Sequence, residues 1–193
     1  MWDGRTRAIE RLPIAAVNRL AAALAADGAD LINLGQAVLG IPPPAGAMDA
    51  VRALLDRGGG HGYSPDPGLP EVLDAVADFL RRVKGIPDAT PARLMLTCGC
   101  NQAFADALLA ITESGDEVVF LGPYYFDHVF TIRLAGCIPV EVPLVQEGDR
   151  WLVDPDRVIA ALTPRTRALV LVSPANPTAH VIPREVLEQL ADA

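Results

Sequence analysis

The chain has 193 residues, of which 51% are hydrophobic and 21% are charged, and its mean hydropathy is +0.27. This is enough apolar material for a sizeable buried core, so the composition excludes a largely disordered chain. The 16 basic and 24 acidic residues give a formal net charge of −8, which argues against sequence-independent electrostatic binding to nucleic acid or anionic lipid. Three cysteines, at positions 98, 100 and 137, are too few for a disulfide framework and lack the paired spacing of a zinc site, so we expect no metal and a cytoplasmic location.

The first 44 residues are predicted to form an N-terminal arm and a small-domain segment. Apolar residues recur at helical spacing between Leu12 and Leu24, and Gly28 follows them, which predicts an amphipathic helix. The apolar run at 20–26 is short and ends at an aspartate, so it predicts neither a signal peptide nor a membrane span. Prolines at positions 42–44 exclude regular structure and predict a hinge before the main body, residues 45–193.

The main body is predicted to alternate helices and strands. Two helices, at 48–55 and 70–83, flank a loop rich in glycine and proline. Beyond residue 91 the pattern predicts strands at 94–97, 117–121, 138–143 and 168–172, helices at 101–112, 125–134 and 155–162, and a last helix containing Val186, Leu187 and Leu190. Such repeated units predict an α/β fold with a mostly parallel sheet and helices on both faces. The unbroken apolar run at 168–172 suits a strand that is covered on both sides.

Three loops at the carboxyl ends of predicted strands are candidates for ligand binding, because open α/β sheets bind ligands at that edge. The stretch 97–102 turns through Gly99 into a helix whose start could hold a phosphate, or it is a tight turn of small packing residues. Tyr124 and Tyr125 follow the second strand and could stack on a flat ligand or form the edge of the core. Asn176 stands between two prolines, which suits either presentation of its amide or an ordinary turn.

Other motifs of catalysis are absent from the sequence. His61, His128 and His180 lie far apart without metal-ligand spacing. No Gly-x-Ser-x-Gly elbow, P-loop or strand-following Gly-x-Gly-x-x-Gly occurs, so hydrolase, NTPase and dinucleotide-binding functions have no positive support.

Six stretches, taken together and in order, resemble the class I/II aminotransferases, which are pyridoxal-phosphate enzymes of fold type I. The stretches are Ile32–Gln36, Tyr63–Pro70, Thr97–Ala103, Gly115–Val118, Pro123–Tyr125 and Ser173–Thr178. The resemblance implies the large-domain fold of that family, incomplete here, and pyridoxal 5′-phosphate as cofactor. It also implies amino-group transfer from an amino acid to a 2-oxo acid.

The resemblance assigns five residues to the cofactor. Gly99, Cys100 and Asn101 would cradle the cofactor phosphate, largely through backbone N–H groups. Tyr125 would stack on the pyridine ring, and Asn176 would hydrogen-bond the phenolic oxygen of that ring.

The resemblance assigns further residues to the substrate and to a partner subunit. Gly35 would lie beside the substrate carboxylate, and Tyr63 would reach across a two-fold interface to the partner's phosphate, so we expect a homodimer. Ala37 and Ala179 stand where glycine is usual in the family, and His180 follows where the loop is normally bland. These departures bear on substrate preference more than on cofactor binding.

The resemblance also implies that this chain is an N-terminal portion of an aminotransferase and holds no catalytic residue. In the family, the Asp that pairs with the pyridinium nitrogen, the Schiff-base Lys and the substrate-binding Arg all follow the Asn-Pro loop, and residues 177–193 alone follow Asn176 here. Lys84 is the only lysine, and it lies at the end of a predicted helix, where a cation complements the helix dipole. Two alternatives to an aminotransferase remain. One is a lyase or synthase with the same cofactor, and the other is a non-catalytic relic or binding module.

Overall fold

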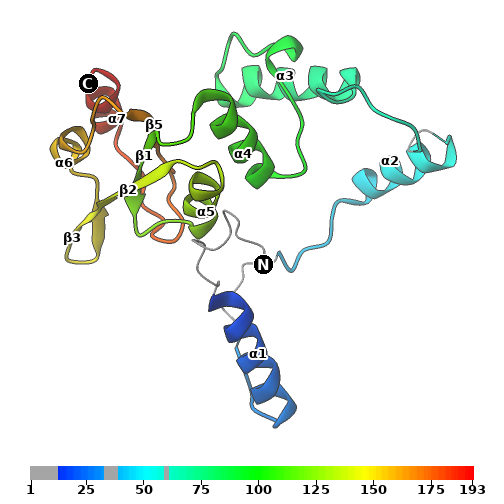
Figure 1. The fold of residues 1–193 in the computed structure, drawn as a ribbon. Helices are drawn as coiled ribbons and strands as arrows, with labels where there is room; N and C mark the ends of the chain where they lie inside the picture. The colour runs from blue at the N-terminus through cyan, green and yellow to red at the C-terminus, as the bar shows by residue number, and fades with distance from the viewer. Residues whose placement is uncertain (1–12, 33–38, 59–60) are drawn as a thin grey trace, which may run out of the picture. The chain divides into compact units, whose positions relative to one another are not determined.

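The computed structural model describes residues 13–32, 39–58 and 61–193 (Figure 1). The contacts between Cα atoms divide the chain into two compact units, with the boundary between Leu96 and Thr97. Among the described residues, no helix combines the length and apolar character needed to span a membrane.

The N-terminal unit is built from helices, as the sequence predicts. They are α1 (Pro13–Ala26), α2 (Ala45–Asp56), α3 (Pro70–Lys84) and the short 3-10 helix η2 (Pro91–Arg93). Helix α3 starts at a proline, whose missing N–H is not needed in the first turn, and stops at Gly85, which has a left-handed φ of 68°. Its buried side chains are Leu73 and Ala77, and Lys84 lies exposed in its last turn.

The strand predicted at 94–97 is wrong, because this segment has no regular structure. A strand is stabilised by a ladder of hydrogen bonds to a neighbouring strand. Within the described part of the N-terminal unit, Leu96 instead makes a single backbone bond, in which its N–H donates to the carbonyl of Pro67 at 2.8 Å. Gly68 packs so closely against Leu96 that a Cβ on the glycine would lie 2.8 Å from Leu96 Cδ1. Among the described residues, Leu96 therefore makes a loop contact and no strand ladder, and Met95 and Leu96 remain exposed.

The C-terminal unit contains a parallel sheet, which confirms the predicted α/β class. Strand β1 (Glu117–Gly122) lies between β2 (Ile138–Pro143) and β5 (Thr166–Val170), and both neighbours run parallel to it. The helices of this unit are α4 (Cys100–Ile111), α5 (Phe126–Leu134), α6 (Pro155–Ala160) and α7 (Arg184–Ala191). A small antiparallel hairpin, β3 (Val145–Glu147) and β4 (Arg150–Leu152), follows β2 and was not predicted.

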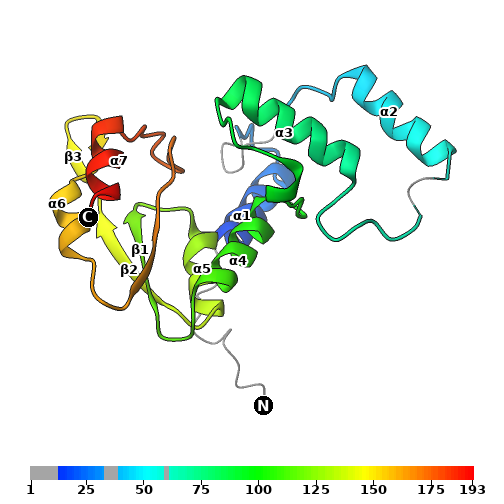
Figure 2. The ribbon, with the colours of Figure 1, turned by 90° about the horizontal axis from the view of Figure 1, so that it is seen from above.

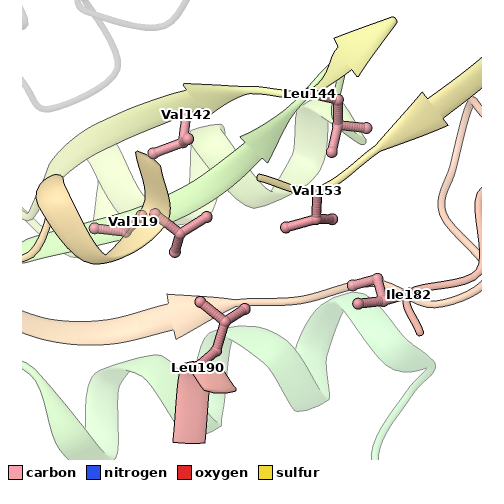
Figure 3. Close-up of a cluster of buried hydrophobic side chains, with 7 residues drawn as sticks. Val119, Val142, Leu144, Val153, Ile182 and Leu190 are labelled. Atoms are coloured by element: carbon pink, nitrogen blue, oxygen red, sulfur yellow. The ribbon is translucent and has the colours of Figure 1, made fainter. Parts of the chain in front are cut away.

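Helices cover both faces of this sheet, as predicted, with α4 and α5 on one side and α6 and α7 on the other (Figure 2). Alternate residues of β1 point to opposite faces, so Val118 and Phe120 pack in one cluster and Val119 packs in the other. The first cluster also contains Leu108, Val129, Ile132 and Cys137. Figure 3 shows the second cluster, in which β1, β2 and α7 contribute Val119, Val142 and Leu190.

Strand β5 is only partly covered, contrary to the prediction for 168–172. The strand begins two residues earlier than predicted, and none of its residues is fully buried. It pairs with β1 alone, so its other edge has no strand beside it within the described residues. An apolar groove between α4 and this edge, lined by Phe104, Leu108 and Ile111, remains open to solvent.

An ion pair between the buried Glu117 and the exposed Arg165 fixes the amino end of β1 to the loop before β5. Thr163 Oγ1 donates a hydrogen bond to Glu117 Oε2 at 2.6 Å, and Arg165 Nε donates to Oε1 at 2.9 Å. These two hydrogen bonds lower the pKa of Glu117 below its ordinary value, and the bond from Thr163 contributes more than the bond from Arg165. The pair lies at the end of the sheet opposite the predicted ligand loops.

Candidate functional site

Two of the three predicted ligand loops border one hollow at the carboxyl end of the sheet. The loop after β1 and the loop after β5 lie side by side because these strands are parallel neighbours. Between them is a small, solvent-open hollow with mostly apolar walls. Its polar lining comes from Tyr124, Tyr125, His128, Asn176 and His180. The structure thus brings Tyr125 and Asn176 to the same place.

The third loop leads into α4 and leaves hydrogen-bond donors free. Gly99 caps the helix with φ 91° and ψ 171°, a conformation that side chains rarely adopt. Cys98 N–H donates to Gln102 Oε1 at 2.8 Å, which closes the turn. The N–H groups of Cys100, Asn101 and Gln102 have no acceptor among the described residues. Three free N–H groups at the positive end of a helix dipole suit an anion such as a phosphate.

A carboxylate that the sequence analysis did not single out connects the α4 start with Tyr125. Asp127 Oδ2 accepts a hydrogen bond from Asn101 Nδ2 and another from the Tyr125 hydroxyl, both at 2.6 Å. The bond to Asp127 raises the pKa of the Tyr125 phenol above its ordinary value, because losing the proton would break it. An acid in the first turn of a helix is so common that the sequence gives no signal of this role.

Aromatic rings surround Tyr125 and restrict its orientation. Its ring meets the His128 ring edge to face, with centroids 5.4 Å apart, and His128 in turn lies 4.5 Å from the Phe104 ring. Burial lowers the pKa of His128, which favours the neutral form of its imidazole. The described residues include no group of three or more His, Cys, Asp or Glu side chains that could hold a metal ion.

The loop after β5 is folded tightly on itself and holds Asn176 at the rim of the hollow. The N–H of Ala175 donates to the His180 carbonyl, and the N–H of Ala179 donates to the Ala175 carbonyl, both at 2.8 Å. Asn176 remains exposed, so its amide is available to a ligand. The Nε2 atom of His180 is buried without a hydrogen-bond partner in the described part of the chain.

The remaining predicted site residues are not part of this arrangement. Gly35 and Ala37 lie outside the described residues. Tyr63 belongs to the N-terminal unit, where its side chain is exposed. Its predicted contact with a partner subunit therefore stays a prediction. The five residues assigned to the cofactor, Gly99, Cys100, Asn101, Tyr125 and Asn176, all belong to the C-terminal unit.

The chain belongs to the aminotransferase class I and II family, whose model matches residues 29–193. Among its relatives, a probable aspartate/prephenate aminotransferase of Thermus aquaticus is 39% identical over 188 residues, which are 97% of this chain and 48% of that protein. A probable N-succinyldiaminopimelate aminotransferase of Mycobacterium tuberculosis is 36% identical and matches 83% of this chain and 40% of its own length.

Solved structures show the same relation. A single mutant of Thermus thermophilus aspartate aminotransferase superimposes with a TM-score of 0.92 and 38% identity. The match covers 100% of this chain and 50% of that structure. The chain therefore has the fold of a partial fold-type-I domain and spans about half the length of the relatives it matches.

Proposed function

We propose that the whole protein is a pyridoxal 5′-phosphate-dependent amino-acid aminotransferase, and that this chain supplies the part that holds the cofactor. The observation that carries the proposal is the convergence, in one unit, of the free N–H groups of α4, the Tyr125 ring and the Asn176 amide. Family membership links this arrangement to amino-group transfer from an amino acid to a 2-oxo acid.

The residues present fit the cofactor in three respects. The start of α4 offers neutral N–H donors to a phosphate without needing a basic side chain. The Tyr125 ring provides an aromatic face for the pyridine ring, and Asn176 offers an amide N–H to its phenolic oxygen. The buried, unpartnered His180 Nε2 beside the hollow is consistent with a polar ligand there.

In this proposal the residues of the chain bind and orient, while the cofactor supplies an electron-withdrawing ring that accepts the electron pair released at the α-carbon of the amino acid. The transfer also needs a base that moves the α-proton. Lys84 is the only lysine in these 193 residues and lies exposed at the end of α3. We therefore assign transamination to the whole protein and not to this stretch alone.

The proposal also includes a homodimer in the cytoplasm, in which Tyr63 reaches the partner's phosphate. The family resemblance supports this assignment. Several relatives are named for aspartate, so aspartate is the first amino donor to test.

The test is an assay of the complete protein with pyridoxal 5′-phosphate, aspartate and a 2-oxo acid. We expect the 2-oxo acid to be converted to the matching amino acid in equal amount to the donor consumed. Consumption of the amino acid without an acceptor would contradict the proposal and favour a lyase. Absence of any cofactor-dependent turnover with a panel of amino donors would favour a non-catalytic module.

A further inference from the structure

The Asp127 carboxylate joins two of the residues assigned to the cofactor. Asn101 Nδ2 and the Tyr125 hydroxyl donate to the same oxygen, Asp127 Oδ2, each at 2.6 Å. Asn101 lies at the start of α4, and Tyr125 immediately precedes α5. The carboxylate therefore connects the phosphate-facing end of one helix to the aromatic ring at the start of another.

The backbone of Asp127 is well placed for this contact. It is the second residue of α5, where the free N–H groups and the helix dipole stabilise a negative charge. Val129 and Ile132 of α5 are buried against β1, which fixes the helix and with it the position of Asp127. A partly buried carboxylate on a fixed helix can hold the exposed Asn101 amide and the partly buried Tyr125 hydroxyl in one geometry.

We propose that Asp127 is a positioning residue, which holds the Tyr125 ring and the Asn101 side chain in the arrangement that binds the cofactor. The inference rests on the proposed function. It also gives the backbone N–H and the side-chain amide of Asn101 different roles. The side-chain amide of Asn101 is engaged by Asp127, so the phosphate is bound by the backbone N–H groups at the start of α4 and not by that amide.

The consequence for binding follows from the donors that Asp127 fixes. With alanine at this position, the Tyr125 hydroxyl and the Asn101 amide lose their acceptor, and the exposed Asn101 side chain regains rotational freedom. We expect the affinity for the cofactor to fall about tenfold. Asparagine keeps one acceptor oxygen but no charge, so Asp127→Asn should fall between the original chain and Asp127→Ala.

The matched control is Asp156, the second residue of α6, which is also an acid in the first turn of a helix. Its side chain is exposed and it does not line the hollow. Asp156→Asn removes the same favourable charge from a helix start, so it reports the general effect on stability. A positioning role predicts that Asp127→Asn weakens the ligand while Asp156→Asn does not.

The experiment uses the complete protein and pyridoxamine 5′-phosphate, which has no aldehyde and cannot attach to amines. Binding is followed by NMR chemical shifts, which report weak affinities. In parallel, ¹³C-labelled tyrosine rings give the pKa of Tyr125 without ligand. We expect the affinity for the ligand to be highest with Asp127, lower in Asp127→Asn and lowest in Asp127→Ala. Asp156→Asn should leave the affinity unchanged. The pKa of Tyr125 should be lower in Asp127→Asn.

The outcomes separate this inference from the proposed function. Binding by the original chain with the same affinity in Asp127→Ala, or an equal loss in Asp156→Asn, would overturn the positioning role and leave the proposed function standing. An unchanged pKa of Tyr125 in Asp127→Asn would also overturn the positioning role. If the complete protein with Asp127 unchanged does not bind the ligand at millimolar concentration, the proposed function fails and the inference fails with it.

Discussion

Ala179 is the one non-glycine residue with a positive φ in the described part of the chain, at 54°. For an L-residue this left-handed conformation costs about 1–2 kcal/mol relative to the right-handed one. Glycine avoids that cost but adds about 0.4–1 kcal/mol of entropy to the unfolded chain. Ala179→Gly should therefore raise the free energy of unfolding by about 0.5–1 kcal/mol. The family resemblance, in which glycine is usual here, points the same way.

The measurement is thermal unfolding, in which a chain of this length shifts its Tm by about 2–4 °C for each kcal/mol. Ala161→Gly is the control, because Ala161 directly follows α6 as its C-cap and has an ordinary right-handed φ of −85°. There glycine adds unfolded-state entropy and removes a methyl group, so it should destabilise by about 0.5–1 kcal/mol. A decrease in Tm for Ala179→Gly, similar to that of the control, would refute the assignment of strain to Ala179.

Three further predictions test other parts of the account. Tyr125→Ala should weaken pyridoxamine 5′-phosphate binding more than Tyr125→Phe, since phenylalanine keeps the ring face and loses only the bond to Asp127; equal affinities would return Tyr125 to core packing. Because its pKa is lowered by folding, Glu117 stabilises the chain above the unfolded carboxyl pKa of about 4.3, and this contribution is lost as the pH falls through the lower folded value. The stability difference between the original chain and Glu117→Gln, measured by urea unfolding, should thus be constant near neutral pH and shrink below about pH 4.3; a difference independent of pH would contradict it. Borohydride reduction with pyridoxal 5′-phosphate should give no stoichiometric label on Lys84, and a specific label there would overturn its structural role.

The elements that the sequence predicts well carry their boundaries in local signals. Proline at position 70 and glycine at position 85 bound α3, and glycine at position 28 follows the end of α1. The parallel sheet follows from repeated apolar runs separated by helices, because that order leaves few other folds. The ligand loops could be located for the same reason, since their position at strand ends follows from the order of elements.

What the sequence did not predict depends on distant partners. Whether 94–97 becomes a strand depends on a neighbouring ladder, and the described structure pairs Leu96 with the Pro67 carbonyl instead. The β3–β4 hairpin turns at Gly148, with a φ of 62°, but its strands are too short for a periodic pattern. Asp127 could not be found because its role arises from a contact with Asn101, which precedes it by 26 positions.

The central claim is that the start of α4 binds the cofactor phosphate through backbone N–H groups. The most direct measurement is a titration of the ¹⁵N-labelled complete protein with pyridoxamine 5′-phosphate, followed by amide chemical shifts. The account predicts the largest shifts at the amides of Cys100, Asn101 and Gln102, and the same amides should respond to inorganic phosphate alone. Saturable binding that leaves these three amides unmoved, or no binding of either ligand, would contradict it.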